Sequence, residues 1–437
     1  QTGVTTVTTN AAVDGNAGAG ITASSTTGGI TIDANASVTG STIGISAVST
    51  SGVIQIDAIA VTGEGFEGVL ASTGGAGTVT VTTTGVVSGA TIGISTTAAD
   101  GATVITTSGT VTGSNGPGID AFSTTGDITI GATQQVTGST TGIEVTSSGG
   151  DIGITAVAVT GTAAEGVLAT TTGTGTVTVT TNGVVQGGTS GISTSAVGGL
   201  TTITANDTVT GAGGNGIGAT STTGGITIDA NATVTGSLRG VSATSTSGVI
   251  QIDAIAVTGQ GAEGVFAQTG GAGTVDVETT GAVLGATSGV VTRAATGLTT
   301  IATSGTVTGT AAQGIDALST TGDITIGATG AVLGGATGIL AASTGGNIGI
   351  TAVAVTGTAD IGVSASTTGA GTVTVTTSGL VTGGTAGIST AAETGLTTIT
   401  TSAAVDGNGG FGIGATSTTG GIDINAAAGV TGSTAGI

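Results

Sequence analysis

The sequence predicts an all-β fold, a parallel β-solenoid of about 18 rungs with 24 or 25 residues in each rung. Three observations lead to this prediction: a fixed repeat, an alternation of apolar and polar residues inside each rung, and glycine-rich turns between short apolar runs. A rung of this length cannot bury its apolar face alone, so it is stable only when stacked on similar rungs. Two or three short strands fit in each rung, and rungs stack at roughly 4.8 Å.

The repeat is marked by a Gly-Ile or Gly-Val pair that begins each rung. The first pairs begin at Gly20, Gly44, Gly68, Gly93 and Gly118, so two shorter steps are followed by two that are longer by one position. This series recurs four times and defines a 98-residue repeat of four rungs. The repeats span 20–117, 118–215, 216–313 and 314–411, with partial repeats at 1–19 and 412–437, and we interpret all of them as one continuous array.

A longer period is also present. The segment VIQIDAIAVTG that begins at Val53 recurs at Val249, two four-rung repeats later. The simplest explanation is tandem duplication of an eight-rung block.

Inside a rung the apolar residues recur at every second position. Ile30, Ile32 and Ala34 alternate with polar residues, as expected for a half-buried β-strand. The third and fourth rungs of each repeat have one additional residue, which we expect before the central strand, as in Gly74–Gly77. The many glycines suit tight corners, which need either positive φ or close backbone approach.

The composition excludes most kinds of chemistry. The 437 residues include no Cys and no His, and the only two basic residues are Arg239 and Arg293. Thiolate or imidazole metal sites, a Ser-His-Asp triad, a Cys nucleophile and a Lys Schiff base therefore cannot form. A net charge of −21 makes nucleic acid an implausible partner. No apolar run is long enough for a transmembrane helix, so we expect no membrane insertion by this segment.

Carboxylates are the only chemically active groups present in number. Six of them fall at matching positions in adjacent rungs, in the pairs Asp33 and Asp57, Asp127 and Asp151, and Asp229 and Asp253. Stacked carboxylates repel, and a cation such as Ca²⁺ would relieve the repulsion, which makes these six the candidate metal ligands. The alternative is that they face solvent and confer solubility. Polysaccharide-degrading β-helices also use paired carboxylates, but this chain has no Trp or Tyr to bind sugars, so we expect no enzyme.

Threonine rows offer a second candidate surface. Thr78-Val79-Thr80 and Thr176-Val177-Thr178 resemble the Thr-x-Thr rows of ice-binding solenoids. Equivalent positions in other rungs carry Gln55 or Asp57, which interrupt the row. The alternative is that threonine is simply a favourable outward residue of a strand.

The rungs resemble the repetitive passenger regions of bacterial autotransporters and related giant secreted adhesins. The resemblance covers the whole chain and rests on recurring runs such as GDITI (Gly126–Ile130), GTVTVTT (Gly77–Thr83) and VTGS (Val136–Ser139). It implies a right-handed β-helix, in line with the usual hand of parallel crossovers, an outer-membrane export route and a location on the bacterial surface.

Together these features predict a structural extracellular fibre or stalk segment that serves adhesion, cell–cell contact or formation of biofilm or sheath. Val7–Gly20 matches Ile399–Gly412, four repeats later, which suggests that the array continues in a longer chain or assembles end to end. Lateral contacts between fibres are a further expected interaction. The alternative function is a binding module that presents repeated Thr and Asp faces to polysaccharide, calcium or ice.

Overall fold

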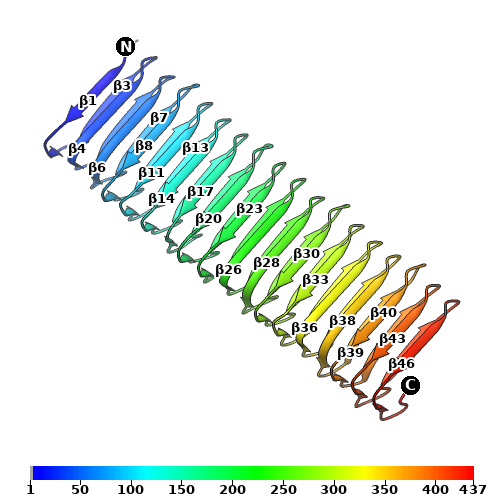
Figure 1. The fold of residues 1–437 in the computed structure, drawn as a ribbon. Coiled ribbons are helices and arrows are strands. Elements are labelled where there is room, and N and C mark those ends of the chain that lie inside the picture. Colours follow the sequence, from blue (N-terminus) through cyan, green and yellow to red (C-terminus); the bar gives the residue numbers. More distant parts are fainter. Residues whose placement is uncertain (1–2) are drawn as a thin grey trace. The chain divides into compact units, whose positions relative to one another are not determined.

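The computed structural model describes residues 3–437, and every regular element in that range is a β-strand. The described residues form no helix that is long and apolar enough to cross a membrane. The chain divides into two compact units, of which the first ends at Ser221 and the second begins at Thr222. Each is a stack of rungs in which a first, a central and a third strand follow one another (Figure 1).

In the first unit, the first strands are β3 (Ile21–Ser25), β5 (Ile45–Ser49), β7 (Val69–Thr73), β10 (Ile94–Ala98), β13 (Ile119–Ser123), β16 (Ile143–Ser147), β19 (Val167–Thr171), β22 (Ile192–Ala196) and β25 (Ile217–Ser221). The central strands are β1 (Thr5–Thr9), β8 (Val79–Thr83), β11 (Thr103–Thr107), β14 (Ile128–Ala132), β17 (Ile152–Ala156), β20 (Val177–Thr181) and β23 (Thr201–Ala205). The third strands are β2 (Val13–Gly15), β9 (Val87–Gly89), β12 (Val111–Gly113), β15 (Val136–Gly138), β18 (Val159–Gly161), β21 (Val185–Gly187) and β24 (Val209–Gly211). In β4 (Ile30–Gly40) and β6 (Ile54–Gly63) the central and third strands are continuous.

In the second unit, the first strands are β27 (Val241–Ser245), β29 (Val265–Thr269), β32 (Val290–Ala294), β35 (Ile315–Ser319), β37 (Ile339–Ser343), β39 (Ile361–Thr367), β42 (Ala386–Ala392) and β45 (Ile413–Ser417). The central strands are β30 (Val275–Thr279), β33 (Thr299–Thr303), β40 (Val373–Thr377), β43 (Thr397–Thr401) and β46 (Ile422–Ala426). The third strands are β31 (Val283–Gly285), β34 (Val307–Gly309), β41 (Val381–Gly383), β44 (Val405–Gly407) and β47 (Val430–Gly432). Continuous central and third strands form β26 (Ile226–Gly236), β28 (Ile250–Gly259), β36 (Ile324–Gly334) and β38 (Ile348–Gly357).

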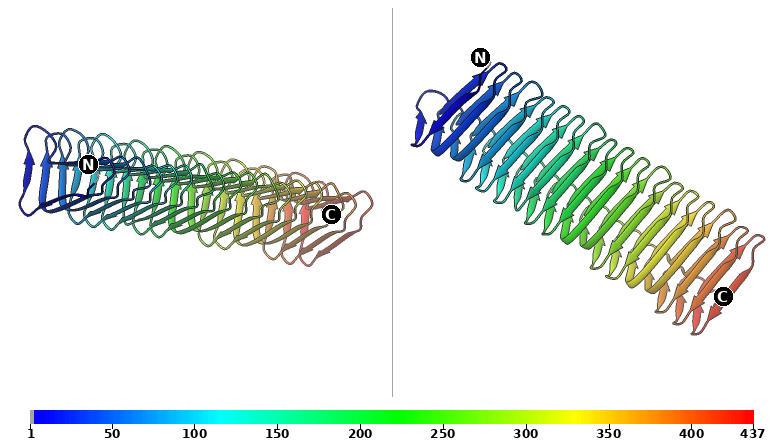
Figure 2. Two further views of the ribbon diagram at one scale, coloured as in Figure 1. Left: turned by 90° about the horizontal axis from the view of Figure 1, so that it is seen from above. Right: turned by 45° about the horizontal axis from the view of Figure 1, so that its top comes forward.

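Corresponding strands of successive rungs pair in parallel and form ladders within each unit. Ile21 lies opposite Ile45, Ile45 opposite Val69, Val69 opposite Ile94, and Ile94 opposite Ile119. These partners follow the same succession of two shorter and two longer steps that the Gly-Ile pairs predict. Figure 2 shows the strands of each ladder side by side from two further directions. The described residues contain 17 first strands, close to the expected 18 rungs, and the predicted parallel β-solenoid is confirmed.

The position of the additional residue is confirmed for the third rung of a four-rung repeat and wrong for the fourth. Strands β7 and β8 begin ten residues apart, whereas β10 and β11 begin nine apart, so the third rung lengthens the turn before its central strand. In the fourth rung the additional residue follows the third strand, because β12 and β13 begin eight residues apart and β9 and β10 only seven. Both turns are rich in small polar residues, and a solvent-exposed turn accommodates one more residue at either corner.

The core of each unit is a thin layer of inward side chains from the three ladders. Ile30, Ile32, Ile54 and Ile56 are at most 1% exposed, and polar residues between them face outward, which confirms the predicted alternation. In the fourth rung of each repeat, threonine takes the first core position of the central strand, where other rungs have isoleucine or valine. Thr103, which lies opposite Val79, is fully buried, and its hydroxyl has no hydrogen-bond partner among residues 3–437.

Close backbone approach, and not positive φ, explains the glycine-rich corners. No glycine in residues 3–437 has a positive φ. A Cβ atom added to Gly101 would overlap the carbonyl oxygen of Gly77, which occupies the same corner one rung earlier. A Cβ atom added to Gly40 would overlap the carbonyl oxygen of Ile43, where the chain folds back toward the next rung. A side chain at either corner would therefore push the backbones apart.

Candidate functional site

Asp127 and Asp151 lie at the turn before the central strand in adjacent rungs. The backbone N–H of Asp151 donates to Oδ1 of Asp127 at 2.8 Å. Oδ1 of Asp151 in turn accepts from the backbone N–H of Thr176 at 2.6 Å and from its hydroxyl at 3.0 Å. The predicted stacking of the two residues is confirmed. Each carboxylate ties its own turn to the next one.

The second unit repeats this arrangement with one informative change. Asp323 accepts from the backbone N–H of Asn347 at 2.7 Å, and Oδ1 of Asn347 accepts from the backbone N–H of Thr372 at 2.9 Å. Asn347 occupies the position that corresponds to Asp151, so a neutral amide oxygen makes the same bond as a carboxylate. At the position of Asp151 this bond therefore needs an acceptor and not a negative charge, which favours a structural role for Asp151 over metal ligation.

The other two candidate pairs lie on the outer face of the central strands. Asp33 is directly opposite Asp57 on β4 and β6, and Asp229 is directly opposite Asp253 on β26 and β28, as the repeat predicts. The side-chain amide of Gln55 donates to Oδ2 of Asp57 at 2.7 Å, and the corresponding amide of the second unit donates to Asp253 at 2.8 Å. In each pair one carboxylate is therefore stabilised by an amide on its own strand.

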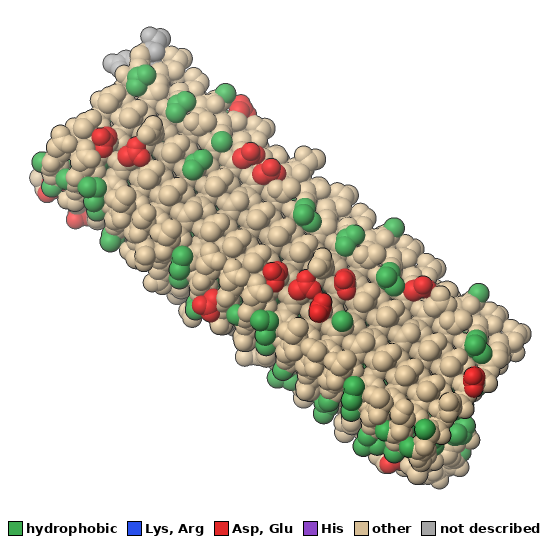
Figure 3. Space-filling model, viewed as in Figure 1, with side chains coloured by type: hydrophobic (Ala, Val, Ile, Leu, Met, Phe, Trp, Pro, Cys, Tyr) green, Lys and Arg blue, Asp and Glu red, His purple; other side chains and the backbone are tan. Residues whose placement is uncertain are grey.

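The second unit extends its acidic pair with two further residues that were not among the six candidate ligands. Glu278 on β30 lies opposite Asp253. Asp276 lies opposite Gln251, the glutamine whose amide donates to Asp253. Asp229, Asp253 and Glu278 line one shallow pocket. Figure 3 shows acidic side chains gathered over β26, β28 and β30. Burial and then the neighbouring Asp253 raise the pKa of Asp276. The repeat gives Glu278 the same rung position as Asp253, and the structure confirms that the two residues are opposite each other.

The carboxylates of this group follow one another along the ladder and do not surround a point. Within residues 3–437, no group of three or more acidic side chains is placed to hold a metal ion. The corresponding pocket of the first unit is lined by Asp33 and Asp57, and has Thr82 where the second unit has Glu278. The two pockets thus differ by one carboxylate at this position.

Both basic residues are held by acidic partners in the second unit. Arg239 pairs with Glu263 at 2.6 Å, and its guanidinium lies 4.3 Å from the centroid of the Phe266 ring. Arg293 pairs with Asp316 at 2.5 Å and also donates to the carbonyl of Asp316 at 3.2 Å. Nothing in the repeat predicted these pairs, because the two arginines are themselves departures from it.

A stacked acidic pair that sequence analysis missed lies on the first strands. Asp120 of β13 is directly opposite Glu144 of β16. Burial raises the pKa of Asp120 to about 6, and the neighbouring Glu144 contributes to the shift. The repeat did not indicate this pair, because its two members are different residue types and neither carboxylate recurs in the next four-rung repeat.

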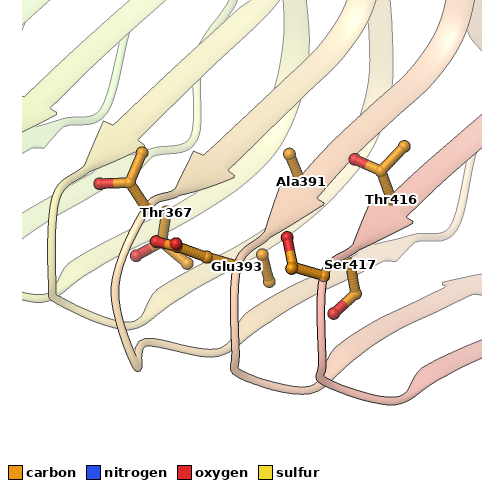
Figure 4. Close-up of a pocket in the computed structure, with 8 residues that line it drawn as sticks. Thr367, Ala391, Glu393, Thr416 and Ser417 are labelled. Carbon is orange, nitrogen blue, oxygen red and sulfur yellow. The ribbon is translucent and has the colours of Figure 1, made fainter.

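A further groove lies where β39, β42 and β45 end, and Figure 4 shows its lining in close-up. It has a volume of about 520 Å³ and is lined by Thr367, Ala391, Glu393, Thr416, Ser417 and their neighbours. Glu393 is the only charged residue in the lining, and the other side chains are short. One carboxylate among threonine, serine and alanine supplies neither an acid–base pair nor a nucleophile with its base.

No family model, curated protein or solved structure matches the chain. The resemblance to autotransporter passenger regions and the hand of the coil therefore stay predictions. The structure itself defines a class: a parallel β-solenoid built from tandem repeats, with side-chain hydrogen bonds that join neighbouring rungs.

Proposed function

We propose that this chain is a structural segment of an extracellular fibre or stalk on a bacterial surface, where it serves adhesion, cell–cell contact or formation of biofilm or sheath. The observation that carries the proposal is the uniform rung-to-rung register within each unit. The backbone N–H groups of Ile21, Ile45 and Val69 donate to carbonyls of the following rung at 3.0, 2.9 and 3.0 Å. Such repetition gives the rungs of a unit equivalent backbone contacts, which suits a structural spacer better than a protein built around one binding site.

The surface chemistry supports an exposed and durable role. The net charge of −21 discourages clumping of neighbouring chains. Trypsin has only Arg239 and Arg293 to cleave, and both side chains are held in ion pairs. The carboxylates of Asp127 and Asp151, at the turns, accept hydrogen bonds from the following rung.

The expected partners follow from the same repetition. The stack continues in its own chain or meets another copy end to end, and neighbouring fibres make lateral contacts. Nucleic acid does not belong to this proposal, because the two cations are already paired.

Immunogold labelling of intact source cells tests the proposed location on the cell surface. Antibodies raised against residues 3–437 are expected to label material outside the cell envelope, and an antibody against a cytoplasmic protein serves as the control. Labelling that needs permeabilised cells would overturn the proposal.

Overnight trypsin treatment of the native chain is expected to give no more than two cuts, and further fragmentation would contradict the durability on which the proposal depends.

A further inference from the structure

The Asp120–Glu144 pair brings two like charges together on adjacent parallel strands, β13 and β16. Both side chains are half-buried. Neither carboxylate takes part in an ion pair, because the two ion pairs among residues 3–437 involve Arg239 and Arg293. Opposed residues of neighbouring strands lie about 5 Å apart, so two ionised carboxylates at this position repel each other.

The surroundings of Asp120 supply no compensating positive charge. Strand β10 packs on one side with Ser95 opposite Asp120, and it carries no ionisable residue. Strand β16 packs on the other side, where Glu144 is the only charged residue. Strand β19 follows with Leu168 opposite Glu144, and the turn before it adds another carboxylate, Glu165. Every charged residue of these strands and of the turn before β19 is therefore negative.

The second unit contains a natural comparison for this position. Asp316 is the residue that corresponds to Asp120 there, and it is 7% exposed. Its carboxylate pairs with Arg293 at 2.5 Å, and the residue opposite it on the following strand is Leu340. The same strand position is thus neutralised by a cation in one unit and opposed by a like charge in the other.

We propose that the Asp120–Glu144 stack makes the contact between β13 and β16 a pH-responsive element of the fold, one that tightens as the surroundings become acidic. Protonation of Asp120 removes the repulsion between the two side chains and the cost of burying a charge. The element acts oppositely to carboxylates held in ion pairs, which weaken a fold when they are protonated.

The direction follows from the pKa of Asp120 in the folded chain, which burial and Glu144 raise from 3.8 to about 6. A carboxyl group whose pKa is higher in the folded state binds its proton more tightly there than in the unfolded chain. Its contribution to stability is therefore complete below pH 3.8 and is lost as the pH rises through about 6. Between about pH 7.5 and about pH 5, the equilibrium between closed and open forms should shift by about tenfold in favour of the closed form.

Hydrogen exchange of the full chain at about pH 5 and about pH 7.5 tests this proposal, after correction for the intrinsic effect of pH on exchange. The protection of amides in β13 and β16 is expected to be about tenfold higher at the lower pH. The amides of β35, which carries Asp316, are the internal control and are expected to keep the same protection. Equal protection of β13 and β16 at both pH values, or an equal change in β35, overturns the proposal.

Two variants separate the titration of this pair from general effects of acid. Asp120→Asn is expected to abolish the pH dependence of protection in β13 and β16. Glu144→Gln, which removes only the like charge, is expected to move the midpoint of the change to lower pH. The two variants are independent, so if one folds poorly the other still decides. Unchanged pH dependence in a folded variant contradicts the proposal.

Discussion

The backbone N–H of Asp151 donates a 2.8 Å hydrogen bond to Oδ1 of Asp127, the residue at the same position one rung earlier. This bond lies at a turn, outside the strands that join the rungs elsewhere. It gives the turn a rung-to-rung connection of its own, and the second unit keeps that connection with Asn347 in place of an aspartate. Aspartate and asparagine at this turn thus both join one rung to the next.

Changing the acceptor at Asp127 should separate the role of the oxygen from the role of the charge. Asp127→Asn keeps an acceptor and is expected to change the free energy of unfolding by less than about 0.5 kcal/mol. Asp127→Ala leaves the N–H of Asp151 without its partner and should cost about 1 kcal/mol. Denaturant unfolding of both variants measures the difference. Equal losses in the two variants would show that the charge itself is needed.

Removal of calcium should leave the melting temperature of the chain unchanged. The carboxylates of Asp127 and Asp151 already accept backbone hydrogen bonds, and those of Asp229 and Asp253 are arranged along a ladder and not around a point. Thermal unfolding followed by circular dichroism, with chelator and with excess Ca²⁺, checks this. If Ca²⁺ raises the melting temperature, Glu278→Thr provides the matched test, because Thr82 occupies the corresponding position of the first unit.

Replacing a buried threonine by valine should stabilise the fold. The hydroxyl of Thr103 is buried without a partner among residues 3–437, and valine already occupies the opposed position at Val79. Thr103→Val is therefore expected to raise the free energy of unfolding by about 1 kcal/mol, since it removes an unsatisfied polar group with little change in volume. The exposed Thr106→Val is the control and should have little effect. A loss of stability in Thr103→Val would mean that its hydroxyl does find a partner in solution.

Glycine should be indispensable at the corners and replaceable on the outer face of a strand. A Cβ atom at residue 101 would overlap the backbone of Gly77, so Gly101→Ala is expected to cost at least about 2 kcal/mol. Gly153 lies within β17, and nothing occupies the space around an added Cβ atom there. Gly153→Ala should therefore raise stability by about 0.5 kcal/mol. Comparable melting temperatures for the two variants would show that the corners can relax.

The fold and its register could be predicted because the Gly-Ile pairs recur at intervals that stacking converts directly into strand partners. Ile21, Ile45 and Val69 each follow the glycine that begins a rung, and they are strand partners because the rungs stack in register. The additional residue of the fourth rung could not be placed from the sequence. The turn before the central strand and the turn after the third strand have the same small polar composition, so residue type does not distinguish them. Turn lengths are set by how corners close, and that closure leaves no distinct signature in residue type.

The candidate sites were predicted only where stacked residues are identical. Asp33 with Asp57 and Asp229 with Asp253 were recognised in this way, and the structure places both pairs in register. Glu278 was not among the candidate ligands, although it occupies the rung position that follows Asp253. Arg239 and its partner Glu263 occupy the same position in adjacent rungs, but the arginine is a departure from the repeat. Arg293 pairs with Asp316 and not with Leu318, the residue opposite it, and the repeat does not encode such a diagonal contact.

The order of corner lengths in the four rungs has a consequence for how such a gene changes length. Within each unit, an interior rung contacts a preceding and a following rung with particular corner lengths, and the same succession returns after four rungs, as the series of partners from Ile21 to Ile119 illustrates. Recombination between misaligned copies that removes or inserts one whole four-rung repeat gives each rung neighbours of the kind it already has. Alleles of this protein should therefore differ in length by whole multiples of that repeat, because every new junction then keeps a succession of corner lengths that the fold already contains.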